Sequence, residues 1–98
     1  MGNSLFDIKG KIALVTGSTH GLGMAMAKGL GHAGATIIIN GNSSQPKIDE
    51  AVLEFKKEGI TVFGYKFNVA VESEVITAIS KIESEVGPID ILINNAGI

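Results

Sequence analysis

Short apolar runs alternate along the chain with longer amphipathic segments. Four apolar runs are bounded by glycine, proline or polar residues, which is typical of strands buried on both faces of a sheet. Three segments between them repeat apolar residues at helical spacing, which predicts helices. The expected strands cover residues 11–16, 35–40, 60–67 and 89–93, and the expected helices cover residues 22–33, 47–58 and 73–86.

Each expected helix carries an apolar face that we predict to pack on the sheet. On the first helix this face consists of Leu22, Ala25, Met26, Gly29, Leu30 and Ala33. On the second helix it consists of Ile48, Ala51, Val52 and Phe55, and on the third of Val75, Ile76, Ile79 and Ile82. A glycine follows each helix and is placed to end it, because glycine adopts the left-handed conformation common after helices.

The alternation of strands and helices predicts an α/β fold, a parallel sheet with right-handed crossovers and helices on both faces. The 98 residues are enough for one small domain. No helix is expected after the last strand, although a parallel sheet needs both faces covered. We therefore expect residues 1–98 to be the N-terminal part of a single larger domain, in a truncated chain.

A glycine-rich stretch joins the first expected strand to the first helix. Gly17, Gly21 and Gly23 lie at positions i, i+4 and i+6. Because glycine has no side chain, a ligand can approach the backbone closely there. The start of the following helix presents unpaired N–H groups and the positive end of the helix dipole. The stretch therefore predicts an anion site suited to the pyrophosphate of a dinucleotide.

Composition excludes several other classes of protein. Hydrophobic residues make up 45% of the chain, which excludes disorder, and a net charge of -2 without a basic patch argues against nucleic acid as a partner. The chain has no cysteine, which fits a cytoplasmic location, and its two distant histidines form no recognisable metal site. We see no signal peptide and no apolar run near the roughly 20 residues that span a bilayer.

The glycine stretch is also one of three motifs by which the chain resembles the short-chain dehydrogenase/reductase family. Residues 16–23 are similar to the family's TGxxxGxG motif, Asn68-Val69 to its Asp-Val or Asn-Val pair, and residues 94–97 to its NNAG motif. One glycine motif alone would be weak evidence, but here all three occur in the family's order and spacing. The resemblance implies a Rossmann-type fold with local strand order 3-2-1-4 and NAD(P) bound across the carboxyl ends of the strands.

The same resemblance implies which residues bind the cofactor. Those we expect to do so are Gly17, Ser18, Thr19, His20, Gly21, Leu22, Gly23, Asn40, Asn42, Ser43, Asn68, Val69, Asn95, Ala96 and Gly97. Residues 18–20 would lie beside the adenosine ribose and phosphates, residues 68–69 beside the adenine, and residues 95–97 under the ribose. Two simpler interpretations stay open: His20 is only an exposed turn residue, and Asn94-Asn95 only ties its loop to neighbouring strands.

The end of the second strand bears on the choice of cofactor. NAD-dependent relatives place an acidic residue there to bind the ribose 2′-hydroxyl. In this chain Gly41 occupies that position between Asn40 and Asn42, so no carboxylate would repel a 2′-phosphate. His20, Asn42 and nearby serines could donate hydrogen bonds to the phosphate. We therefore expect NADP to be preferred, with NAD as the alternative.

The family's reaction transfers a hydride between nicotinamide and a carbonyl or secondary alcohol. Loose similarities around Lys9-Gly10-Lys11 and residues 87–90 resemble the gluconate 5-dehydrogenase branch, and the 3-oxoacyl carrier-protein reductase branch shares many of these residues. The family's catalytic residues are a Ser and a Tyr-x-x-x-Lys, but the only tyrosine here, Tyr65, is followed four residues later by Val69. No catalytic residue is therefore predicted within this chain.

Alternative functions stay open for the 98 residues. One alternative is a non-catalytic nucleotide-binding module without the catalytic part. A P-loop NTPase is excluded because Met24 and Ala25 follow Gly23 where that motif needs Lys and Ser or Thr. The family resemblance further implies a small-molecule substrate, a dimer or tetramer for the full-length protein, and no nucleic-acid or membrane partner.

Overall fold

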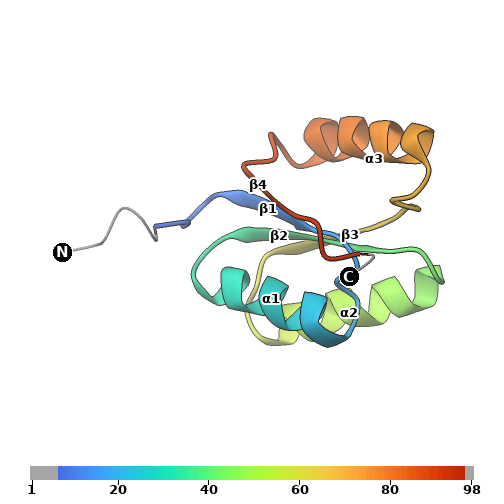
Figure 1. Ribbon diagram of the computed structural model, residues 1–98. Helices are drawn as coiled ribbons and strands as arrows, with labels where there is room; N and C mark the ends of the chain where they lie inside the picture. Colours follow the sequence, from blue (N-terminus) through green and yellow to red (C-terminus); the bar gives the residue numbers. More distant parts are fainter. Residues whose placement is uncertain (1–6, 97–98) are drawn as a thin grey trace.

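The computed structural model describes residues 7–96 and has a parallel sheet between two layers of helices (Figure 1). The strands are β1 (Ile12–Val15), β2 (Thr36–Gly41), β3 (Val62–Lys66) and β4 (Ile91–Ile93). The helices are α1 (Gly21–His32), α2 (Gln45–Lys57) and α3 (Glu72–Glu85). Every element expected from the sequence is present, with its ends shifted by at most two residues.

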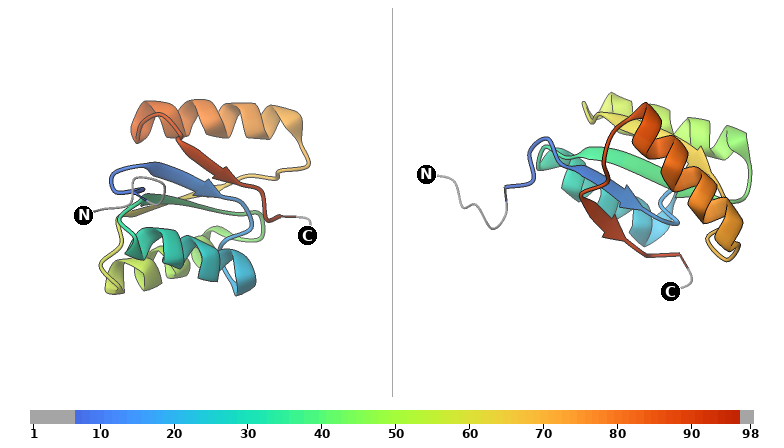
Figure 2. Two further views of the ribbon diagram at one scale, coloured as in Figure 1. Left: turned by 60° about the vertical axis from the view of Figure 1, so that its left-hand side comes forward. Right: turned by 90° about the horizontal axis from the view of Figure 1, so that it is seen from above.

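The sheet order is β3-β2-β1-β4, and all three strand pairs are parallel. At the centre of the register, Leu14 of β1 lies between Ile38 of β2 and Leu92 of β4. Helices α1 and α2 cover one face of the sheet and α3 covers the other (Figures 1 and 2). The predicted α/β fold of Rossmann type and its local strand order are therefore confirmed.

Side chains that alternate along the buried strands form a core on each face of the sheet. On the side of α1 and α2, Val15 and Ile39 join Phe55 in the larger cluster of buried residues. On the side of α3, Leu14 and Ile38 pack with a smaller cluster that includes Phe67 and Ile82. The sheet is thus apolar on both faces, as continuous hydrophobic strands require.

The inward face predicted for α1 is wrong at most of its positions. Leu22 is 65% exposed, and Ala25, Gly29 and Ala33 are exposed as well. The buried or closely packed positions of α1 include small residues four apart, Gly23, Ala27 and Gly31, and of the predicted face Leu30 packs against the core. A β-carbon added at Gly31 would lie 2.6 Å from Ile60 Cγ2, so size rather than hydrophobicity selects this face.

The predicted face of α2 is confirmed, because Ile48, Ala51 and Phe55 are buried. On α3 the prediction fails at Ile76, which is 62% exposed, whereas Ile82 is fully buried. Helix α2 begins after Ser44, whose Oγ accepts a hydrogen bond from the Lys47 N–H at 3.4 Å. Within residues 7–96 no helix is long and apolar enough to cross a membrane.

Candidate nucleotide-binding site

The predicted cofactor residues meet where the strands end. Because the strands are parallel, the carboxyl ends of β1, β2 and β4 lie along one edge of the sheet. Residues 17–23, which comprise the connection after β1 and the first residues of α1, are called the glycine turn below. Gly17 (φ 61°) and Gly21 (φ 59°) both take up the left-handed conformation there. A β-carbon added at Gly21 would meet nothing within 4 Å, so the turn is open on its outer side.

Gly23 packs against the start of the same turn. A β-carbon at Gly23 would lie 2.1 Å from the Gly17 carbonyl oxygen and 2.6 Å from Asn95 Nδ2. Real β-carbons do not come this close to other atoms, so only glycine fits without moving the backbone. The position therefore sets the shape of the turn, in addition to any contact with a ligand.

The Asn40 side chain, at the end of β2, supports the glycine turn from the inside of the protein. Its side chain is 2% exposed. Its Oδ1 accepts a hydrogen bond from the Gly17 N–H at 2.9 Å, and its Nδ2 donates to the Phe67 carbonyl at 3.0 Å. The amide thus connects β1, β2 and β3. The Asn40 side chain thus contacts protein and supports the turn, and contact between Asn40 and a cofactor stays a prediction.

Ser18 also points inward. Its side chain is fully buried, and its Oγ donates to the Val15 carbonyl at 2.6 Å and accepts from the Asn40 N–H at 3.0 Å. The Ser18 N–H donates to the Asn40 carbonyl at 2.9 Å. The Ser18 hydroxyl therefore fixes the turn to β2, and contact between Ser18 and the ribose or phosphates stays a prediction.

Thr16 organises the segment after β4, a role that the sequence analysis did not assign to it. Its Oγ1 donates to Asn94 Oδ1 at 3.1 Å and accepts from the N–H groups of Asn95 and Ala96 at 3.0 and 3.1 Å. Asn95 Nδ2 donates to the Gly17 carbonyl at 3.1 Å. The Asn pair thus ties its loop to β1, one of the interpretations left open above. Gly97 lies outside the described residues.

The remaining predicted residues surround this edge. His20, Leu22, Asn42, Ser43 and Val69 are exposed to solvent. The His20 Nδ1 lies 3.3 Å from Thr19 Oγ1. The structure brings these groups to the open side of the glycine turn and the strand ends, where a ligand could reach them.

Asn68 is used within its own loop. Its Oδ1 accepts a hydrogen bond from the Ala70 N–H at 2.9 Å. Its backbone N–H donates to Glu74 Oε1, also at 2.9 Å. These bonds fix the connection from β3 to α3 and leave Val69 exposed at its outer side. Contact between this loop and an adenine stays a prediction.

Gly41 is the last residue of β2 and is buried. A β-carbon there would lie 2.8 Å from Thr19 Cγ2 and 3.3 Å from Ile48 Cγ1. Thr19 therefore occupies the space that the side chain of an acidic residue would need. A side chain at position 41 would therefore have to displace the Thr19 methyl group.

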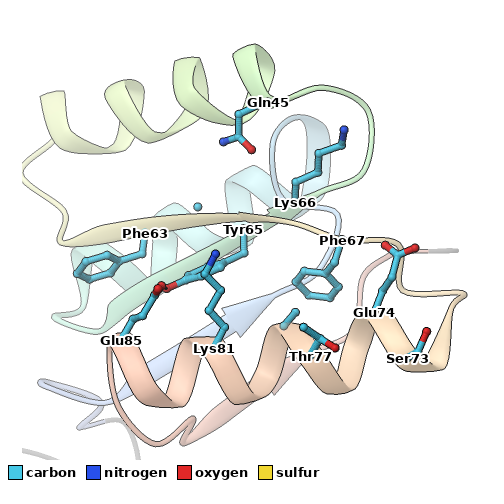
Figure 3. A pocket seen from close by; sticks show the side chains of 12 residues that line it. Gln45, Phe63, Tyr65, Lys66, Phe67, Ser73, Glu74, Thr77, Lys81 and Glu85 are labelled. Carbon is cyan, nitrogen blue, oxygen red and sulfur yellow. The ribbon is translucent and has the colours of Figure 1, made fainter.

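A cavity of about 700 Å³ lies elsewhere, along β3 and α3 (Figure 3). None of the predicted cofactor residues lines it. It contains Tyr65, whose hydroxyl donates to Glu85 Oε1 at 2.7 Å. Burial and this hydrogen bond raise the pKa of Tyr65 to about 12. With its pKa raised in this way, the Tyr65 hydroxyl stays protonated near neutral pH.

The geometry agrees with comparisons to known proteins. Residues 11–98 match the family model for short chain dehydrogenases. The chain is 78% identical over 98 residues to 2-dehydro-3-deoxy-D-gluconate 5-dehydrogenase of Formosa agariphila, covering 100% of this chain and 37% of that protein. It is 45% identical over 96 residues to 5-keto-D-gluconate 5-reductase of Escherichia coli, covering 98% of this chain and 37% of that protein.

A solved structure shows the same fold. The crystal structure of a gluconate 5-dehydrogenase from Burkholderia cenocepacia, in complex with NADP and tartrate, superposes with a TM-score of 0.88 at 43% identity. The match covers 95% of this chain and 36% of that one. The chain therefore belongs to the short-chain dehydrogenase family, and it spans 37% of the length of the curated relatives named above.

Proposed function

We propose that this chain binds NADP(H) at the glycine turn and forms the cofactor portion of a single Rossmann domain. The observation that carries the proposal is the fixed, open turn: Asn40 and Asn95 hold its backbone from inside, while its outer side faces open space. Backbone N–H groups at such a turn, at the start of a helix, suit a pyrophosphate. The glycines fit this role because a side chain at Gly23 would collide with the turn.

NADP is preferred over NAD in this proposal. Thr19 fills the place of the acidic residue that would otherwise bind a 2′-hydroxyl and repel a 2′-phosphate. His20, Asn42 and Ser43 are exposed beside that position and can donate hydrogen bonds to the phosphate. The solved gluconate 5-dehydrogenase similar to this chain holds NADP, which supports the same choice.

The proposed reaction is hydride transfer between nicotinamide and a carbonyl or secondary alcohol. The substrate would be a sugar acid such as gluconate or 5-keto-gluconate, because the relatives named above act on gluconate derivatives. The family's Tyr-x-x-x-Lys pair is not among these 98 residues, so the reaction belongs to a protein that also contains it. Such a protein would work in the cytoplasm as a dimer or tetramer.

Calorimetric titration of the 98-residue chain with NADPH and NADH tests the cofactor proposal. We expect both to bind and NADPH to bind more tightly. Gly23→Ala should abolish binding, because the added methyl group displaces the Gly17 carbonyl. Gly29→Ala on the same helix is the matched control: its methyl group would meet nothing within 4 Å, so binding should stay unchanged. A urea titration of each variant separates lost binding from lost folding.

Two results would contradict this proposal. One is a chain that is folded but binds neither nucleotide. The other is NADH binding clearly more tightly than NADPH. A third result would change the description of the protein. If the chain binds NADPH, but a longer protein that contains the Tyr-x-x-x-Lys pair does not reduce keto-gluconate, the non-catalytic nucleotide-binding module is the correct description.

A further inference from the structure

A second, smaller groove opens beside the glycine turn, between α1 and α2. Its volume is about 360 Å³. Thr19, His20 and Met24 line it from the turn and α1. Lys47, Glu50, Ala51 and Glu54 line it from α2. Thr19 belongs to both places, because it also covers Gly41 at the end of β2. The groove therefore shares Thr19 with the end of β2, where a 2′-phosphate is expected.

The charged residues between α1 and α2 are paired only at the far end of the two helices. We call Lys28, His32, Glu54 and Glu58 the α1–α2 seam. The Lys28 ammonium bonds to Glu54 and, at 2.7 Å, to Glu58, whose other oxygen lies 2.7 Å from His32 Nε2. The seam thus neutralises Glu54, one of the two carboxylates that line the groove.

The charged side chains at the open end of the groove differ from those of the α1–α2 seam in their pairing. Within the described part of the chain, Lys47 has no carboxylate oxygen within 4.0 Å, and neither does His20. Glu50 has no cationic partner within that distance either. One unpaired ammonium and one unpaired carboxylate therefore line the same small space, together with the Thr19 hydroxyl and the His20 ring.

From this arrangement we propose that Lys47 and Glu50 together set how strongly the chain prefers the 2′-phosphorylated dinucleotide. Lys47 attracts the phosphate by a charge-assisted hydrogen bond, and Glu50 weakens that attraction by repulsion. Neither residue was identified from the sequence, because both lie on the helix and outside the strand ends. The proposal rests on the proposed function, since it assigns residues to the 2′-phosphate of the bound nucleotide.

The test compares the affinities for NADPH and NADH in single variants of the 98-residue chain. Lys47→Gln should lower the NADPH:NADH affinity ratio by about tenfold, the size of one lost charge-assisted contact. Glu50→Gln should raise the ratio by about two- to threefold, because only a repulsion across solvent is removed. Affinity for NADH should stay nearly unchanged in both variants, because NADH has no 2′-phosphate.

Lys57→Gln is the matched control, because Lys57 is an exposed lysine at the end of the same helix and does not line the groove. Its affinity ratio should equal that of the unmodified chain. Adenosine 2′,5′-bisphosphate against 5′-AMP gives the same comparison without the nicotinamide half. If Lys47→Gln leaves the affinity ratio unchanged, or lowers it no more than Lys57→Gln does, the inference is overturned and the proposed function still stands. Absence of all nucleotide binding overturns both.

Discussion

Two polar regions of this small fold are built in opposite ways. At the carboxyl ends of the strands, Thr16, Ser18 and Asn40 are buried, and their side-chain hydrogen bonds are made inside the protein. In the α1–α2 seam, Lys28 and Glu58 are joined by ion pairs at the surface. Unpaired buried polar groups are costly, whereas surface ion pairs contribute little. We conclude that the buried network fixes one shape of the glycine turn and that the seam only supports helix packing.

Asn40→Leu should have the largest effect on stability. The variant leaves the Gly17 N–H and the Phe67 carbonyl without their partner in a buried place, which costs about 3 kcal/mol of unfolding free energy. Urea denaturation measures this loss. Asn42→Leu, two residues along at an exposed position, is the control and should change stability by less than about 0.5 kcal/mol. Equal losses of stability in the two variants would contradict the conclusion that the buried hydrogen bonds of Asn40 fix the glycine turn.

Thr16→Val should have a smaller effect, mostly local to the segment after β4. The N–H groups of Asn95 and Ala96 lose their acceptor, so we expect a loss of about 1–2 kcal/mol. Hydrogen exchange at these two amides should become faster while exchange in α2 stays the same. Thr61→Val, at an exposed threonine before β3, is the control. Unchanged exchange at residues 95 and 96 would mean that Thr16 does not hold this loop.

Lys28→Met should have the smallest effect, and its size should depend on pH. Hydrogen bonds from Lys28 and His32 lower the pKa of Glu58 below 4.5, and bonds to Glu54 and Glu58 raise the pKa of Lys28 above 10.5. Because the pKa of Glu58 is lowered, its carboxylate stabilises the fold above pH 4.5, and this stabilisation is lost as the pH falls through the lowered pKa. Because the pKa of Lys28 is raised, its ammonium stabilises the fold below pH 10.5, and this stabilisation is lost as the pH rises through the raised pKa.

The urea midpoint of Lys28→Met should therefore lie below that of the unmodified chain mainly between pH 4.5 and 10.5. High salt should reduce the difference, because these charges are exposed and screened. The same measurement on Lys56→Met provides the control for removing an exposed lysine. A loss at neutral pH as large as that of Asn40→Leu would contradict the comparison.

Much of this arrangement could be predicted from the sequence. The four apolar runs and the three amphipathic segments gave all the elements, and the family resemblance gave the strand order. The glycine turn was located because its three glycines stand between a strand and a helix. These features are encoded locally, by residue type and spacing.

The rest depends on contacts between distant residues. The inward face of α1 follows the small residues Gly23, Ala27 and Gly31, because the helix lies close to the sheet, and a hydrophobicity pattern does not report that distance. Asn40 looks like a ligand-binding residue at a strand end, but its amide turns inward to Gly17 and Phe67. Neither orientation can be predicted without knowing which backbone groups need a partner.

Amide NMR spectra of the 98-residue chain, recorded during titration with NADPH, test the central claim most directly. The account predicts that the resonances of the glycine turn, Asn42 and Ser43 move together and saturate. The resonances of Thr77 and Lys81, at the larger cavity between β3 and α3, should stay in place. Shifts centred on that cavity, or no shifts in a folded chain, would contradict nucleotide binding at the carboxyl edge of the sheet.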